Sequence, residues 1–140
     1  MKTSSAIDLD KLVDPYKLPA EVLSSAVQAL DSKSLEFTLN YGMDSEYYVY
    51  LHFFDFEDRT NKQKRKLNIV IDDNVTQFLT LSYWKPNSII LPIKHGMGIW
   101  KILIEANPDS DLPGMLNALE IYRVVPQSDS STQQEDGRFL

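Results

Sequence analysis

The stretch from Tyr47 to Glu57 constrains this chain more than any other, because its eleven residues include six Tyr and Phe rings and no Gly, Pro or Asn. Aromatic and β-branched residues favour the pleated, half-buried surface of a β-strand. Side chains along a strand alternate between its two faces. We therefore predict a central strand with a core face of Val49, Leu51 and Phe53 and an opposite, partly wet face of Tyr48, Tyr50, His52, Phe54 and Phe56.

Apolar runs separated by turn-forming residues continue on both sides of this strand. Gly, Pro, Asn and Asp recur at short intervals, as tight connections require. About seven or eight short strands at this spacing, without long helices between them, indicate an all-β antiparallel sandwich or barrel. The predicted strands are residues 35–40, 47–56, 66–72, 76–82, 88–93, 99–106 and 116–125.

Alternation within these runs also predicts which side chains form the core. Apolar positions alternate with polar or amphipathic ones, as expected when two sheets each bury one face. The expected inward sets are Leu67, Ile69 and Ile71; Ile89, Leu91 and Ile93; Trp100, Ile102 and Ile104; and Leu119 and Ile121.

Residues 22–29 fit two structures. Their apolar side chains recur at helical spacing, after a Pro and a Glu that are typical of a helix start. Alternate positions also fit a weak extended run, and a neighbouring sheet overrides local preference. Both a helix and a strand stay open here.

We expect one sandwich domain over residues 18–126, with polar segments at both ends. Residues 1–17 are predicted to be a lead-in segment, in which Pro15 discourages regular structure. Residues 127–140 have too little apolar surface to fold and are predicted to be a disordered linker or tail. Only the last four residues, 137–140, depart from that polar composition.

Composition restricts the classes of partner and chemistry. A formal charge of −6 and a pI near 4.8 argue against a nucleic-acid or anionic-membrane partner. The sequence contains no Cys, two His and none of the common catalytic motifs. We therefore expect no enzymatic activity, no cofactor and no metal site. The residues also include neither a signal peptide nor an apolar run long enough to span a membrane.

Two aromatic groups are the candidate ligand-binding residues. Tyr48, Tyr50, His52 and Phe54 combine rings that stack on a ligand with hydroxyl and imidazole groups that form hydrogen bonds. Tyr83 and Trp84 lie beside a predicted turn. Each group has a structural alternative. In the alternative for the first group, loops or the N-terminal segment cover these side chains. In the alternative for the second group, Trp84 plugs the end of the core.

Charged and polar turns complete the expectations. The run 59–66 holds five basic residues in eight and is predicted to be a solvated loop. Asp55 and Glu57 are expected on a solvated acidic edge, and Asp72-Asp73-Asn74 in a turn. Asn74-Val75-Thr76 is a sequon, so Asn74 is a candidate N-glycosylation site.

Several of these motifs together resemble one family, the malectin-like domains of plant leucine-rich-repeat receptor kinases. The run 47–53 followed by Asp55 and Glu57 resembles the family strand Tyr-Tyr-Val-Tyr-Leu-His-Phe-x-Glu-x-Glu. Leu112-Pro113 followed by 116–122 resembles its closing Leu-Pro-x-x-Leu-Asn-Ala-x-Glu-Ile-Tyr. Residues 65–69 and the opening Pro19, Val22 and Ala26 are similar to further family motifs.

The resemblance implies a jelly-roll-like, galactose-binding-like β-sandwich of about seven to nine strands. It also implies a non-enzymatic, carbohydrate-binding-like recognition module with a glycan, protein or peptide ligand, or alternatively a spacer domain without a glycan ligand. The expected setting is the extracellular face of a plant plasma membrane. There the chain would be the second malectin-like module of a receptor, beside a neighbouring module and leucine-rich repeats.

Overall fold

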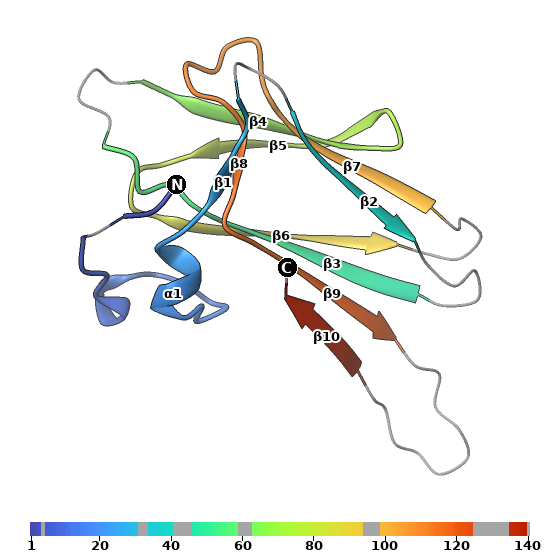
Figure 1. Ribbon diagram of the computed structural model, residues 1–140, viewed down its shortest axis with the longest axis horizontal. Helices are drawn as coiled ribbons and strands as arrows, with labels where there is room; N and C mark the ends of the chain where they lie inside the picture. Colours follow the sequence, from blue (N-terminus) through green and yellow to red (C-terminus); the bar gives the residue numbers. More distant parts are fainter. Residues whose placement is uncertain are drawn as a thin grey trace.

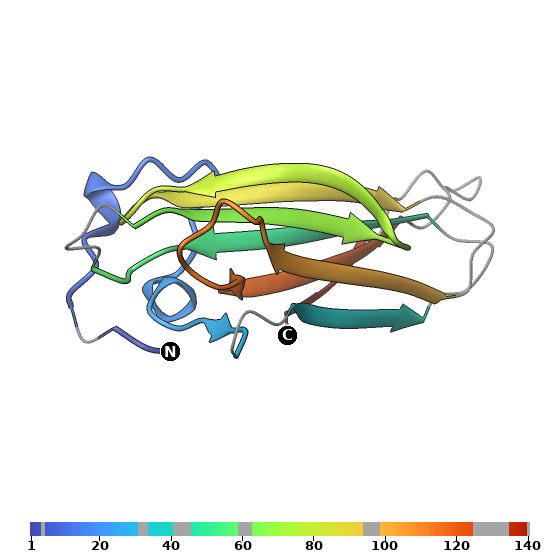
Figure 2. The same cartoon turned by 90° about the horizontal axis from the view of Figure 1, so that it is seen from above.

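The computed structural model describes residues 1–3, 5–30, 34–40, 46–58, 63–93, 99–124 and 135–139. Over these residues the chain forms two four-stranded antiparallel sheets that stack on one another, with strands running along the long axis (Figure 1). Figure 2 looks through one sheet onto the other. The predicted all-β antiparallel sandwich is confirmed.

The first sheet has the strand order β10-β9-β3-β6 and the second has the order β2-β7-β4-β5. A short ladder of β1 and β8 and two small helical turns complete the described structure. In the first sheet the strands are β10 (Glu135–Phe139), β9 (Ala118–Val124), β3 (Glu46–Phe54) and β6 (Pro86–Ile93). In the second they are β2 (Leu35–Asn40), β7 (Ile99–Ala106), β4 (Arg65–Ile71) and β5 (Asn74–Leu81). The remaining elements are β1 (Val27–Gln28), β8 (Met115–Leu116), the 3-10 turn η1 (Leu9–Lys11) and α1 (Ala20–Leu23).

The core lies between the two sheets, where sequence alternation placed it. Val49, Leu51 and Phe53 of β3 are fully buried. The inward sets expected from β4, β6, β7 and β9 belong to the same cluster, with Trp100 and Ile121 partly buried at its margin. Burying a side chain of this size contributes roughly 1.5–3 kcal/mol to the stability of the fold. These sets therefore hold the two sheets of the sandwich together.

Strand β3 lies in the middle of the first sheet, and its register fixes what surrounds its outer face. Tyr48 pairs with Tyr122 of β9, and Tyr50 pairs with Glu120. On the other side, His52 pairs with Ser88 of β6. Paired residues share a face, so aromatic and polar side chains from three strands meet on the outside of this sheet.

The predicted turn at Asp72-Asp73-Asn74 is confirmed. Ile71 pairs with Asn74, so Asp72 and Asp73 form a two-residue hairpin turn. Both have positive φ angles, 47° and 67°, as a tight hairpin between twisted strands requires. The Asp72 carboxylate also accepts a hydrogen bond from the Lys101 backbone N–H at 3.0 Å, which ties the turn to β7.

Residues 22–29 contain parts of both expected structures. Pro19 precedes a single helical turn, α1, and the chain then extends into β1, which pairs with β8. A four-residue helix has little stability of its own. The available partner strand therefore determines the conformation of the rest of the segment.

The prediction of an irregular tail is wrong for residues 135–139. These residues form β10 and pair with β9, with Gly137 opposite Tyr122. The edge of β9 presents backbone N–H and C=O groups, and pairing with them does not require an apolar sequence. Residues 127–134 and 140 of the predicted tail lie outside the described residues.

Candidate functional site

The outer face of β3 is only partly accessible. Tyr48 is 39% exposed and Tyr50 is half-buried, but His52 and Phe54 are fully buried and Phe56 is nearly so. The expectation of a partly wet face is therefore wrong for His52, Phe54 and Phe56. Figures 1 and 2 show the N-terminal segment gathered at the end of the sandwich where β3 finishes.

Two rings cover the buried half of this face. The Tyr16 ring lies 5.5 Å from His52 and 5.9 Å from Tyr50, in edge-on contacts. The Trp84 ring lies 5.0 Å from Phe54. At His52, therefore, the N-terminal segment covers the face, which is the structural alternative given above.

His52 is the centre of a buried polar network across three strands. Its Nδ1 lies 2.7 Å from the Ser88 hydroxyl of β6, and its Nε2 lies 2.8 Å from a Glu120 carboxylate oxygen of β9. The other oxygen of Glu120 accepts a hydrogen bond from the Tyr122 hydroxyl at 3.0 Å. A satisfied network of this kind holds strands in register and fixes ring orientation.

The accessible half of the face forms a groove of about 240 Å³, lined by Tyr48, Tyr50, Tyr122 and Val124. We call it the tyrosine groove. The Tyr50 and Tyr122 rings are 5.2 Å apart and tilted by 59°. The sequence prediction missed Tyr122 and Glu120. Their alternation with the inward residues Leu119 and Ile121 places both on the outer face, but only the pairing of β9 with β3 brings them beside Tyr48 and Tyr50.

The second predicted aromatic group divides into two roles. Tyr83 is 48% exposed, with its ring 5.7 Å from that of Trp84. Trp84 packs against the core, and its backbone N–H donates to the Asp55 carbonyl at 2.8 Å. Its positive φ of 59° is unusual for a bulky residue, so the surrounding contacts hold it in place. Trp84 therefore plugs the end of the core, and Tyr83 stays accessible.

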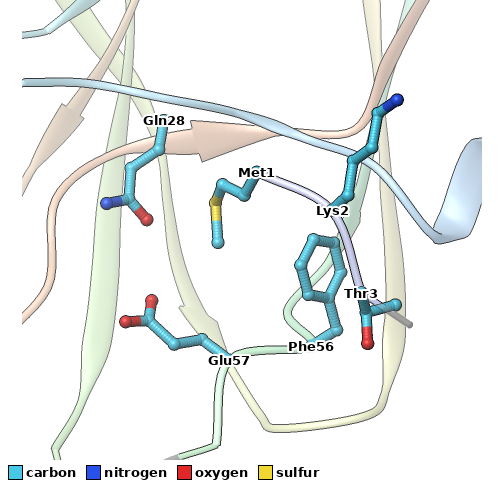
Figure 3. Close-up of a pocket in the computed structure, with 6 residues that line it drawn as sticks. All are labelled: Met1, Lys2, Thr3, Gln28, Phe56 and Glu57. Carbon is cyan, nitrogen blue, oxygen red and sulfur yellow. The ribbon is translucent and has the colours of Figure 1, made fainter. Parts of the chain in front are cut away.

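A second cavity, of about 450 Å³, lies at the same end of the sandwich as the N-terminus. We call it the end pocket. Figure 3 shows the Met1 side chain with Gln28 and Glu57 on one side and the Phe56 ring on the other, and the Lys2 amine directed away. Its lining residues are Met1, Lys2, Thr3, Gln28, Phe56 and Glu57.

The polar groups of the end pocket are engaged by a buried cation. Arg65 is fully buried and pairs with the buried Asp55 carboxylate at 2.8 Å. It also donates to Glu57, to the Pro113 carbonyl and, at 3.5 Å, to Gln28. Burial lowers the pKa of Arg65, while the charge and hydrogen bond of Glu57 raise it. A ligand in this pocket would compete with Arg65 for its partners.

This cluster corrects two charge predictions. Asp55 is not on a solvated edge, and Arg65 is not part of a solvated loop. Each was assigned from the polarity of its sequence neighbours, whereas strand pairing brings them together inside the fold. Residues 59–62 of the basic run lie outside the described residues.

Asn74 is exposed at the first position of β5, directly after the hairpin turn. Its side-chain amide donates to the Asp72 carbonyl at 3.2 Å. Within the described ranges, no cluster of three or more His, Asp or Glu side chains is arranged to bind a metal ion. No helix among these residues has the length and hydrophobicity to cross a membrane.

Comparison with known proteins places this geometry in context. The family model for the malectin-like domain matches residues 1–124. Two similar curated proteins are leucine-rich-repeat receptor-like serine/threonine-protein kinases of Arabidopsis thaliana. One is 34% identical and covers 87% of this chain, and the other is 30% identical and covers 86%. The chain spans about 15% of the length of each.

Solved structures agree on the fold. The ANX2 ectodomain from Arabidopsis thaliana superposes with a TM-score of 0.69 at 19% identity, covering 86% of this chain and 38% of that one. A structure of the plant peptide RALF23 with FER and LLG2 contains a chain that superposes with a TM-score of 0.62 at 18% identity, covering 79% and 34%. The match of the family model over most of the chain shows that this protein belongs to the malectin-like domain family.

Proposed function

We propose that this chain is a non-enzymatic recognition module in the ectodomain of a plant receptor kinase, and that its tyrosine groove binds carbohydrate. The observation that carries the proposal is the grouping of three tyrosine rings, from Tyr48, Tyr50 and Tyr122, around one groove on the outer face of the first sheet. Such rings present apolar faces to sugar C–H groups and hydroxyls to sugar hydroxyls.

The network beneath the groove supports this assignment because it pre-orders the groove. Glu120 is nearly buried and accepts from both His52 and Tyr122. The Tyr122 ring therefore has a fixed hydroxyl partner and loses little conformational freedom on binding. Pre-ordered side chains reduce the entropy cost of association.

The tyrosine groove is a better candidate than the other two sites. In the end pocket, Glu57 and Gln28 already contact Arg65. Tyr83 is accessible, but the partly buried ring of its neighbour Trp84 packs against the core, which leaves Tyr83 without a second exposed ring beside it. Of the residues predicted from sequence, we therefore retain Tyr48 and Tyr50 as ligand contacts and add Tyr122.

An array of plant cell-wall oligosaccharides, including glucose disaccharides, tests the proposal. We expect at least one saccharide to bind the chain and Tyr48→Ala to remove the signal. Phe78→Ala is the matched control, because it removes an exposed ring from the opposite sheet. Absence of any saccharide signal, or equal signals from wild type and Tyr48→Ala, would count against the carbohydrate assignment.

A second candidate is recognition of a peptide or protein. One structurally similar chain comes from the crystal structure of the plant peptide RALF23 in complex with FER and LLG2. The same groove accepts a peptide side chain as readily as a sugar ring, since aromatic anchors serve both. Binding of a peptide library that is lost in Tyr48→Ala, without any saccharide binding, would favour this candidate.

The similar kinases also support an extracellular setting beside other receptor modules. The sequence of the full-length parent tests this part directly. We expect a secretion signal, leucine-rich repeats and a kinase domain in that sequence. A parent without a secretion signal would contradict the extracellular placement.

A further inference from the structure

Strand β5 is an edge strand without the protection that the other edges of the two four-stranded sheets carry. It has a neighbour, β4, on one side only among the described residues. Edge strands commonly carry charges or prolines that prevent pairing with another chain. The edge strand β6 contains two prolines, and β2 and β10 contain charged residues. By contrast, β5 reads Asn-Val-Thr-Gln-Phe-Leu-Thr-Leu, with neither.

The side chains of β5 also favour pairing with another chain. Phe78 is 71% exposed and Val75 is 49% exposed. They pair with Asn68 and Val70 of β4, so both lie on the outer face of the second sheet, opposite the core. An uncharged run with high β-propensity and exposed apolar groups is the pattern that favours association between chains.

The one sequon in the sequence lies on this strand. Asn74 is the first residue of β5 and is exposed after a two-residue turn, with Thr76 two positions later. A register shift between Ile69 and Val70 of β4 interrupts the regular β4–β5 pairing near the start of β5. The remainder of β5, towards Leu81, has no such irregularity in its pairing.

From the unprotected β5 edge and the exposed sequon at its start, we propose that Asn74 carries an N-linked glycan. We propose further that this glycan protects the β5 edge from pairing with a second copy of this chain. A branched, hydrated glycan at the start of the strand would occupy the space that an antiparallel partner strand needs. The proposal rests on the extracellular placement in the proposed function, because N-glycosylation requires secretion. It does not depend on what the tyrosine groove binds.

Secretion of the chain from plant cells behind a signal peptide tests both parts. We expect intact mass to show one N-glycan that peptide-N-glycosidase removes and that Asn74→Gln lacks. Light scattering after size exclusion should show a monomer for the glycosylated chain. Trimming of the glycan on the folded protein by an endoglycosidase leaves one sugar on an uncharged Asn74, whereas peptide-N-glycosidase would leave a charged Asp there. This form of deglycosylation should strengthen self-association by at least about tenfold, the change expected from pairing one Phe-sized contact.

Phe78→Lys is the matched variant, because it adds a charge to the exposed strand and leaves the core unchanged. The deglycosylated Phe78→Lys protein should be monomeric. Deglycosylation after folding answers the question even if Asn74→Gln is not secreted. An unmodified Asn74, an unchanged oligomeric state after deglycosylation, or association that persists in Phe78→Lys would overturn the proposal. Saccharide binding by Tyr48→Ala, tested separately, reports only on the proposed function.

Discussion

At the residue scale, the buried Arg65 shows how a few polar contacts restrict what this fold tolerates. Its guanidinium is surrounded by Asp55, Glu57 and the Pro113 carbonyl, at the end of the sandwich where β3 finishes. A buried ion pair adds little net stability over an apolar pair, but removal of one partner leaves an uncompensated charge. The two carboxylates differ in exposure, so they should differ in their effect on stability.

Asp55→Ala should lower the free energy of unfolding by about 3–5 kcal/mol, because it leaves the buried Arg65 charge without its fully buried partner. Glu57→Ala should lower it by about 1 kcal/mol or less, because Glu57 is 40% exposed and water replaces it. Urea unfolding followed by Trp fluorescence measures both. Equal effects of the two substitutions would show that the buried pair is not the dominant contact.

His52 and Asn117 show which residue roles a sequence conceals. The partners of the Asn117 side chain are 63 to 94 residues away along the chain. Nothing local to either residue indicates these contacts. His52 alternates with tyrosines, which suggested access to solvent, but the Tyr16 ring covers it from a segment predicted to be only a lead-in.

At the element scale, Asn117 connects the short N-terminal elements to the first sheet. Its side-chain oxygen accepts from the Phe54 backbone N–H at 2.6 Å. Its amide donates to the carbonyls of Leu23 and Ser25, in and after α1. The four residues of α1 are too few to form a stable helix alone, so these bonds and the β1–β8 ladder hold the segment.

Asn117→Ala should therefore destabilise the fold by about 3 kcal/mol, because one N–H and two carbonyls lose their partner. Asn117→Asp keeps the acceptor but places a charge against two carbonyls, so it should be at least as destabilising. Thermal unfolding measures both, with Gln77→Ala on the exposed edge strand as the control. A melting temperature for Asn117→Ala equal to that of the control would contradict this role.

The connection before β8 tests close packing between elements. A Cβ added at Gly114 would lie 2.7 Å from the backbone oxygen of Ile104, a contact that real Cβ atoms do not make. Gly114→Ala should cost about 1–3 kcal/mol, because the backbone has to move apart. In urea unfolding, Thr80→Ala on the surface of β5 should change stability by less than about 0.5 kcal/mol. A Gly114→Ala variant as stable as wild type would show that the connection yields easily.

The strands were largely predictable, and the reasons are local. Alternation and turn residues located β2 to β7 and β9 to within about two residues, the usual uncertainty at strand ends. The helix-or-strand alternative at 22–29 was not decidable, because β8, which pairs with β1, lies far along the chain. Strand β10 was missed for a different reason, since the edge of β9 and not the polar composition of residues 135–139 determines its structure.

At the scale of the whole molecule, the sandwich separates its outer surfaces. The first sheet carries the tyrosine groove, and the second carries the exposed β5 edge with Asn74. The sequence identified Tyr48, Tyr50 and Asn74 as candidates because their residue types are informative. The groove itself required strand order, since Tyr122 lies beside Tyr48 only through the pairing of β9 with β3.

The most direct test of the proposed recognition role is a calorimetric measurement of the dissociation constant between this chain and a saccharide that the array identifies as a ligand. The wild-type chain is compared with Tyr48→Ala/Tyr122→Ala and with the control Phe78→Ala. The groove model predicts that the double variant binds at least about tenfold more weakly, because two stacking rings are lost, while the control is unchanged. Unchanged affinity in the double variant, with its fold intact by circular dichroism, would contradict the proposal that the tyrosine groove is the ligand site.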